Sequence, residues 1–328
     1  MRPGRWLNNA SAIKSKGFYM TKMKTLLKDF VDTHVHAGPT LTVREFNVWQ
    51  LAAEAEKGGF RAMVLKDHFI PTVPVDRAMQ EKLGHIRLKI FGSLALNNSV
   101  GGINPKAVEI AIGFGAKMIW MPTISAANHR RKHRVPGTKF PVLMKEEAVA
   151  DKPLNVIGAD GVLTPETEDI LNLLADHPDV VLATGHLSRE EVDALVRRCA
   201  QLGIKRILVT HPHFLVDASV DDMRNWQSMG AYMEFTAVIS LPSSPIYCRP
   251  VEDVANLIKL LDVEKIVLSS DLGLKKAGWP IEGMSAFLEL LHETGVSSDD
   301  LKKMIATNPA KLLNLKADRL CVSRTNTQ

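Results

Sequence analysis

The chain has 328 residues, of which 45% are hydrophobic and 23% are charged. This length suits one large barrel or two mid-sized domains, and the composition is ordinary for a globular protein. No apolar run approaches the ~18 residues that a membrane-spanning helix needs, so no membrane association is expected. The three cysteines (Cys199, Cys248 and Cys321) are far apart. They indicate neither a disulfide framework nor a Cys-x-x-Cys zinc site, and they predict a reducing, cytoplasmic location.

The formal net charge of +5 is unevenly distributed along the chain. Residues 1–28 contain seven Lys and Arg residues and no Asp or Glu, so the rest of the chain carries a net charge of −2. A body so close to neutral predicts no nucleic-acid partner. We interpret residues 1–28 as a basic N-terminal extension: a disordered or transit-like arm, or an upstream stretch if translation starts at Met20 or Met23.

From residue 30 onwards, short β-branched and apolar runs alternate with amphipathic segments. Eight of these runs are five to nine residues long, which fits strands better than helices. The predicted strands are Phe30–His36, Arg61–Lys66, Leu88–Leu96, Lys117–Met121, Val180–Thr184, Arg206–Thr210, Ala231–Phe235 and Lys265–Ser269.

Helical patterns lie between these strands. Gly58-Gly59 indicates a helix end, and Ser188 followed by Glu191 has the spacing of a capping box. The predicted helices include Asn47–Lys57, Pro105–Gly115, Pro165–Asp176, Asp221–Met229, Val251–Leu261 and Ile281–Thr294, with one or two short ones in Ser297–Leu315. This alternation predicts an α/β fold, a (β/α)8 TIM-type barrel over residues 29–316, followed by a polar tail over 317–328.

One connection, Ile124–Thr164 after the fourth predicted strand, is unusually long. Asp160-Gly161 within it lies between two apolar pairs, which predicts a two-residue hairpin. We interpret the run His129–Arg134 in the same connection as a solvated charged loop. The alternative is a clamp in which Arg130 and Arg131 bind a carboxylate or phosphate, because guanidinium forks match those anions.

His34-Val35-His36 ends the first predicted strand. Side chains at i and i+2 share one face of a strand, so the two imidazoles can project together and hold a divalent ion. Asp32 precedes them on the same face, where a carboxylate can orient a ligand.

Further polar residues end other predicted strands. Lys66 and His68 follow the second strand, His186 the fifth, His211 the sixth and Asp271 the eighth. A barrel brings the carboxyl ends of its strands into one ring, which is where such folds place their active sites. We therefore expect these side chains to form one site. We interpret His213 as lying outside the residues that contact the ion directly, and the strand pattern leaves open the direction in which Glu234 faces.

These marks resemble the amidohydrolase superfamily of metal-dependent hydrolases, from Phe30 to about Leu315. The resemblance implies that His34, His36, His186 and Asp271 bind a divalent metal, with Asp271 also acting as general base. It implies that His211 or His68 stabilises developing negative charge. Lys66, His211, Arg130 and Arg131 are candidates for an additional ligand or a substrate contact. Zinc is the expected metal, with manganese, iron and nickel as alternatives, because all of them suit imidazole and carboxylate ligands.

Two departures from the family pattern affect the expected chemistry. The fourth strand, around Met118–Thr123, lacks the lysine or glutamate of many two-metal members, which favours one ion over two. Lys66-Asp67-His68 resembles an element of the PHP phosphoesterases, but the Asp-x-His that normally ends that family is Asp271-Leu272-Gly273 here.

The predicted function is metal-dependent hydrolysis of a C–N or C–O bond in a small polar molecule by a metal-activated water. A metal-dependent decarboxylase or other lyase, a PHP-type phosphoesterase and a non-enzymatic metal-binding barrel are the alternatives. The expected partner is a small-molecule substrate, and the sequence leaves a homo-oligomer open.

Overall fold

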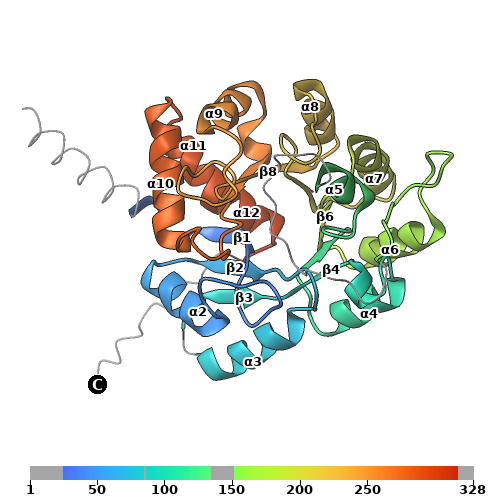
Figure 1. Cartoon of the computed structure of the whole chain (residues 1–328), viewed down its shortest axis with the longest axis horizontal. Helices are drawn as coiled ribbons and strands as arrows, with labels where there is room; N and C mark the ends of the chain where they lie inside the picture. The colour runs from blue at the N-terminus through green and yellow to red at the C-terminus, as the bar shows by residue number, and fades with distance from the viewer. Residues whose placement is uncertain (1–24, 85, 134–150, 317–328) are drawn as a thin grey trace, which may run out of the picture.

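The structure, a computed structural model, describes residues 25–84, 86–133 and 151–316. Parallel strands lie at its centre and helices surround them (Figure 1). The predicted N-terminal extension lies outside the described residues except for its last four, among which Leu27 is buried in the core. The predicted polar tail also lies outside them. Among the described residues, none of the helices has the length and hydrophobicity of a bilayer-spanning helix.

The strands pair in parallel and form two sheets, with the orders β1-β2-β3 and β4-β5-β6-β7-β8-β9. Strands adjacent in a sheet are consecutive in the chain and are connected through helices, which is the predicted βα alternation. The strands are β1 (Val31–Val35), β2 (Ala62–Leu65), β3 (Lys89–Phe91), β4 (Ser93–Ala95), β5 (Met118–Trp120), β6 (Val181–Ala183), β7 (Ile207–Thr210), β8 (Tyr232–Thr236) and β9 (Ile266–Ser269).

The helices include two that the sequence did not predict, α3 and α5. The helices are α2 (Val48–Lys57), α3 (Val73–Leu83), α4 (Pro105–Gly113), α5 (Ala127–His133), α6 (Pro165–Asp176), α7 (Arg189–Gln201), α8 (Val220–Ser228), α9 (Val251–Leu260), α10 (Pro280–Glu293), α11 (Ser298–Lys302) and α12 (Asn308–Leu312), with a π-helical turn, η3 (Lys303–Thr307), before α12. Capping side chains explain several boundaries: Asn47, Ser188 and Ser219 each form a reciprocal capping box at a helix start.

Strands β3 and β4 are two parts of one predicted strand, which is interrupted at Gly92. A Cβ atom on Gly92 would lie 2.5 Å from the Cα atom of Val73, at the start of α3, so only glycine fits this close approach. The amide of Gly92 donates to Asp76 Oδ2 of the same helix at 2.5 Å. The single interrupting residue thus separates the two sheets.

The chain after β9 runs beside β1. The amide of Asp271 donates to the carbonyl of His34 at 2.7 Å, and the amide of His36 donates to Leu272 O at 2.8 Å. Val35 and Leu272 form an isolated parallel bridge. Within the described part of the chain, no continuous ladder joins β1 to β9, so the predicted barrel is observed as two parallel sheets whose outer edges meet.

Alternate strand residues form an inner apolar cluster, which contains Val31, Val64, Trp120 and Val267. Side chains of the α12 region, among them Leu312, belong to the same cluster and cover the amino ends of the strands. Larger apolar residues on the other strand faces pack against the surrounding helices. The core therefore closes one end of the strands and leaves the carboxyl ends for polar residues.

The long connection after β5 differs in part from its prediction. Ala127–His133 forms helix α5, so the prediction of a solvated loop is wrong for that stretch. An antiparallel bridge joins Ile157 to Leu163. Five residues lie between these two, so the bridge does not enclose the two-residue turn predicted at Asp160-Gly161. Residues 134–150 of this connection lie outside the described residues.

Candidate active site

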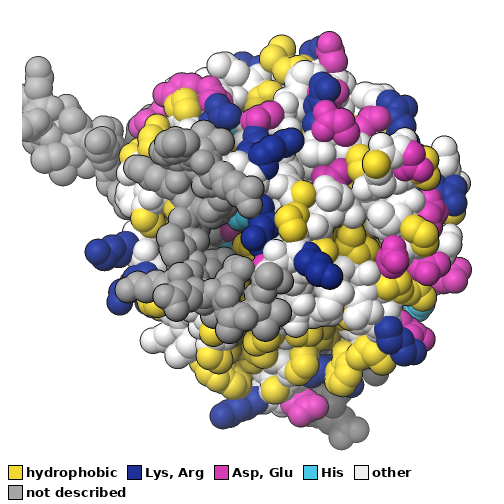
Figure 2. Space-filling view, turned by 45° about the vertical axis from the view of Figure 1, so that its right-hand side comes forward, with side chains coloured by type: hydrophobic (Ala, Val, Ile, Leu, Met, Phe, Trp, Pro, Cys, Tyr) yellow, Lys and Arg dark blue, Asp and Glu magenta, His cyan; other side chains and the backbone are white. Residues whose placement is uncertain are grey.

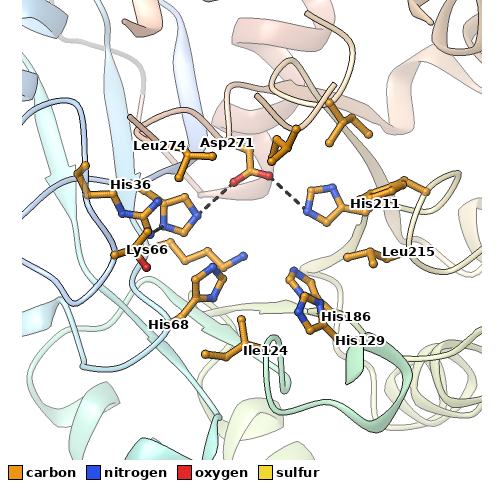
Figure 3. Close-up of a pocket in the computed structure, with 15 residues that line it drawn as sticks. His36, Lys66, His68, Ile124, His129, His186, His211, Leu215, Asp271 and Leu274 are labelled. Carbon is orange, nitrogen blue, oxygen red and sulfur yellow. Dashed lines mark hydrogen bonds and ion pairs between the residues drawn. The ribbon is translucent and has the colours of Figure 1, made fainter. Parts of the chain in front are cut away.

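The pocket at the carboxyl ends of the strands brings together most of the predicted site residues (Figure 3). Its volume is about 80 Å³, which suits a small molecule. Its polar lining consists of His36, Thr42, Arg44, Lys66, His68, His129, His186, His211 and Asp271. The remaining lining residues are apolar: Ile124, Phe214, Leu215, Ile239, Ile246 and Leu274.

A β-bulge in β1 sets the direction of His34. The register pairs Asp32 with Met63 and Val35 with Leu65, so β1 contains one residue more than β2 over this stretch. As a result, two consecutive residues reach the same carboxylate. The hydroxyl of Thr33 donates to Glu234 Oε1 at 3.2 Å, and His34 Nδ1 lies 3.2 Å from Glu234 Oε2.

Asp271 lies among three imidazoles. Its Oδ1 atom is 3.0 Å from His34 Nε2 and 3.1 Å from His36 Nε2, and its Oδ2 atom is 3.5 Å from His211 Nε2. Figure 3 shows the carboxylate between His36 and His211. Ligand atoms of His34, His211 and Asp271 all lie within 4.8 Å of one another, so these residues can hold a metal ion.

Electrostatics keep this carboxylate ionised. Burial alone would raise the pKa of Asp271, but His34, His36 and His211 outweigh it and hold this pKa well below its usual value. Burial would likewise lower the pKa of His34, but Asp271 and Glu234 raise it. Burial lowers the pKa of His211 to about 4, which leaves a neutral imidazole with a lone pair for a cation.

Glu234, whose direction the strand pattern left open, contacts His34 Nδ1. It is fully buried, and its carboxylate also accepts a hydrogen bond from Ser269 at 2.8 Å. A carboxylate at Nδ1 holds the proton there and leaves Nε2 free to coordinate, as such partners do in metal sites. The available signal was an acidic residue inside the apolar strand Tyr232–Thr236.

Asp32 does not orient a histidine ring as predicted. Its Oδ1 atom accepts from the backbone amides of Ser270 at 3.0 Å and His34 at 3.3 Å. Its buried Oδ2 atom has no hydrogen-bond partner in the described part of the chain, and burial raises the pKa of Asp32 to about 6. The bulge is the reason, because it breaks the alternation that would place Asp32 and His34 on one face. Asp32 therefore ties β1 to the segment after β9.

Two strained residues end strands at the pocket. His211 and Asp271 have φ angles of 50° and 49°, in the left-handed region that non-glycine residues rarely adopt. Close approaches accompany them: a Cβ atom on Gly273 would lie 2.0 Å from His36 O, and one on Gly185, before His186, would lie 2.3 Å from a carbonyl of the β5 segment. The backbone is thus bent so that these side chains face the pocket.

Lys66 lies at the centre of the pocket and is 2% exposed. Its Nζ atom is 2.9 Å from His34 Nε2 and 4.2 Å from the centre of the Trp120 ring. Burial lowers the pKa of Lys66 to about 8. The lysine predicted as an additional ligand or substrate contact therefore reaches the candidate metal ligands.

His68 and His186 line the pocket at some distance from the group around Asp271. His68 Nδ1 is 2.9 Å from Thr123 Oγ1. His186 Nδ1 is 2.8 Å from Nδ1 of His129 on α5, and the two rings stack with centroids 4.7 Å apart. The predicted ligand His186 thus lies beside the group formed by His34, His211 and Asp271, and its ring centre is 5.6 Å from that of His211.

His129 is a pocket residue that the sequence analysis missed, because it treated the basic run as a loop. Helix α5 buries His129 against His186, whereas Arg130 and Arg131 do not line the pocket. Arg130 Nη1 donates to Asp151 Oδ2 at 2.7 Å, and Arg131 Nη2 donates to Asn128 Oδ1 at 2.7 Å. Helical periodicity in residues 127–133 was the available signal.

Arg44 is a second missed residue. It comes from the segment between β1 and α2, and its Nη2 atom is 3.1 Å from His36 Nδ1. His213, in contrast, lies outside the pocket and packs edge-on against Phe235, with no hydrogen-bond partner for either ring nitrogen among the described residues.

The chain belongs to a family of unknown function, DUF6282, whose match covers residues 29–234. No curated protein matches the sequence. The description of this family names no activity. The solved structures with a similar backbone inform the fold.

Several solved structures share the fold at low sequence identity. An amidohydrolase from Pseudomonas aeruginosa has a TM-score of 0.59 and 10% identity, with 90% of this chain and 98% of that chain covered. The probable dipeptidase PvdM from the same organism has a TM-score of 0.59 and 11% identity, with 90% and 97% covered. A 2,6-dihydroxybenzoate decarboxylase from Rhizobium has a TM-score of 0.50 and 12% identity, with 88% and 100% covered. The fold is therefore like that of the amidohydrolase superfamily, and these comparisons do not show PHP-like features.

Proposed function

We propose that this protein is a metal-dependent hydrolase that cleaves a C–N or C–O bond in a small polar substrate. The observation that carries the proposal is the group of His34, His211 and Asp271, whose ligand atoms lie within 4.8 Å of one another and of which His211 and Asp271 line the pocket. The proposal treats the two sheets as one (β/α)8 barrel, which the bonds between β1 and the segment after β9 support.

The donor set fits a divalent ion. Imidazole nitrogens bind zinc at ~2.0–2.1 Å, and a buried anionic carboxylate beside imidazoles is a typical catalytic ligand set. His34 and Asp271 belong both to the predicted ligands and to the observed group, and His36 Nε2 contacts the same carboxylate. His186 and His211 are the candidates for completing the site. When bound, such an ion lowers the pKa of water towards ~7 and polarises a scissile bond.

The residues of the chain provide the remaining chemistry. The Asp271 carboxylate accepts a proton from the attacking water, because its position between imidazoles keeps it ionised. Imidazoles of His68 and His211 reach the pocket, where they stabilise negative charge that develops on the substrate. The Glu234 carboxylate holds His34 in orientation from outside the pocket.

A second candidate function is metal-dependent decarboxylation. The composition of the pocket favours it, because six of its lining residues are apolar. An apolar surrounding disfavours the charged carboxylate of a bound acid relative to neutral carbon dioxide. Both candidate reactions use the same metal group.

Metal content and isotope tracing test the proposal. We expect one or two divalent ions per wild-type chain by plasma mass spectrometry, lost in a His34→Ala/His36→Ala double variant. A His177→Ala/His292→Ala variant, whose histidines lie outside the pocket, is the matched control and should retain the metal. Metal contents of His186→Ala and His211→Ala then identify which imidazole completes the site.

Turnover by stripped and reloaded enzyme, on amide, lactone, β-keto acid and aromatic acid substrates, separates the two reactions. Incorporation of ¹⁸O from water into the product supports hydrolysis, and release of carbon dioxide supports decarboxylation. Wild-type protein that takes up no metal even after reconstitution would refute both.

A further inference from the structure

The lining of the pocket combines polar and apolar side chains. Figure 3 shows Leu274 beside His36, Ile124 between His68 and His129, and Leu215 beside His211. The apolar residues come from the segments that follow β5, β7, β8 and β9: Ile124, Phe214, Leu215, Ile239, Ile246 and Leu274. A fully polar substrate would leave these six side chains without a complementary group, so the ligand needs an apolar part.

Arg44 offers an anion-binding group in this lining. Among the described residues, its buried Nε atom has no hydrogen-bond partner, and its Nη2 atom lies 3.1 Å from Nδ1 of His36. No described carboxylate lies within ion-pair distance of Arg44, and the charges of Asp67 and Asp271 act on it from further away. A half-buried guanidinium with an unpaired Nε atom favours a ligand that brings two oxygens in one plane.

The two hydrogen bonds of the His36 ring link Arg44 to the candidate metal site. A guanidinium only donates, so His36 Nδ1 must accept from Arg44 while His36 Nε2–H donates to Asp271. For Nε2 to coordinate a metal, the ring proton has to move to Nδ1, which can then no longer accept from Arg44. Use of His36 as a ligand therefore releases Arg44 Nη2, and the guanidinium needs another acceptor.

The charge of the pocket points in the same direction. Arg44 and Lys66 are its basic side chains other than histidine, and Asp271 is its one acidic lining residue in the described part of the chain. A divalent ion held by Asp271 would add positive charge to this lining, which an anionic substrate offsets.

We propose that the substrate is a small organic acid with an apolar body, whose carboxylate binds Arg44 and whose body packs against the apolar lining. The inference rests on the proposed function, because it names the substrate class of the same site. A carboxylate is favoured over a phosphate because six of the lining side chains are apolar and match an organic body attached to the acid group. Phosphate recognition is an outcome of the test.

Binding of probe molecules tests this inference without turnover. The dissociation constants of benzoate, benzamide, acetate and inorganic phosphate are measured by calorimetry on stripped and zinc-loaded full-length protein, whose metal content is determined on the same samples. The variants are Arg44→Gln, the charge-conserving Arg44→Lys, and Arg131→Gln as the matched control, because Arg131 does not line the pocket.

We expect benzoate to bind wild-type and Arg131→Gln protein equally, and Arg44→Gln to weaken this binding roughly ten- to a hundredfold, the range for charge-assisted hydrogen bonds. Arg44→Lys should lose less, which tests the inference even if Arg44→Gln does not fold. Benzamide should bind at least about tenfold more weakly than benzoate, and so should acetate, which lacks the apolar body.

Equal binding of benzoate and benzamide, or benzoate binding that Arg44→Gln leaves unchanged, would overturn the inference. Phosphate binding that depends on Arg44 without benzoate binding would also overturn it. The proposed function fails separately, if the protein binds no metal or metal gives no turnover, whatever the affinity for benzoate.

Discussion

At the carboxyl ends of the strands, imidazoles, a lysine and an aspartate are buried together, whereas buried polar groups at the amino ends donate to backbone carbonyls. Asn308 is an example from the amino ends: its Nδ2 atom donates to Val263 O at 2.7 Å and to Ile266 O at 2.8 Å. At the carboxyl ends, Asp271 instead contacts three side chains that are themselves candidate ligands.

Backbone conformation does not separate the two ends. His211 and Asp271 end their strands with left-handed φ angles of 50° and 49°, and Asp29 and Asn314 at the amino ends have φ angles of 68° and 51°. At the amino ends, the guanidinium of Arg206 donates to carbonyls of Lys311 and Leu312 and fastens the α12 region beneath the strands. Buried charge thus gathers where chemistry is proposed, and side-chain bonds to backbone carbonyls lie where only stability is needed. Figure 2 shows acidic and basic side chains interspersed on one outer face.

Replacement of Asp271 by Asn should give the largest effect and should affect function alone. Asn keeps the shape and tolerates a left-handed backbone, but it is neither an anionic ligand nor a base. We expect kcat/KM to fall by about 10²–10⁴-fold, with lower metal content and an unchanged circular dichroism spectrum. Asp217→Asn is the matched control, because Asp217 also has a left-handed φ, of 53°, and lies outside the pocket. Wild-type activity of Asp271→Asn would contradict the assignment.

Replacement of Asn308 by Ala should lower the stability of the protein and leave its function unchanged. The variant leaves buried carbonyls without their donor, so the free energy of unfolding should fall by about 1–3 kcal/mol. Urea denaturation measures this change, and metal content and kcat/KM should stay at wild-type values. Asn225→Ala on α8, where the side chain makes no hydrogen bond with the described residues, is the control. Loss of metal in Asn308→Ala would contradict the assignment of stability to the amino ends of the strands and metal binding to their carboxyl ends.

The smallest expected effect concerns Glu54, a buried carboxyl at neither end of the strands. Burial raises the pKa of Glu54 to about 8, and the nearby charge of Glu282 adds to this shift. The folded state therefore holds the proton more tightly than the unfolded chain, whose carboxyl has a pKa near 4.5. This contribution to stability is complete below pH 4.5 and is lost as the pH rises through about 8.

Unfolding of Glu54→Gln, measured in urea between pH 5 and pH 9, checks this sign. The wild-type free energy of unfolding should decline over this range more than that of Glu54→Gln, and the variant should be the more stable protein at high pH. Glu289→Gln on α10 serves as control and should follow the wild type. Identical pH profiles for Glu54→Gln and wild type would show that Glu54 is ionised in the folded state.

Much of the fold followed from patterns of a few residues. Helix α6 has the predicted bounds Pro165–Asp176, and Ser188 caps α7 as its spacing with Glu191 indicated. Local capping and periodicity suffice there, because the contacts involved span one or two turns. The break at Gly92 was not predictable in this way, since it depends on the approach of α3 from elsewhere in the chain.

The sequence by itself determined which strand ends carry polar side chains, because His186, His211 and Asp271 each come shortly after an apolar run. Only the tertiary structure decided how these side chains combine. The bulge turns His34 towards Glu234, helix α5 brings His129 to His186, and Arg44 reaches His36 from a loop. These outcomes depend on register and on contacts between distant segments, which no local pattern encodes.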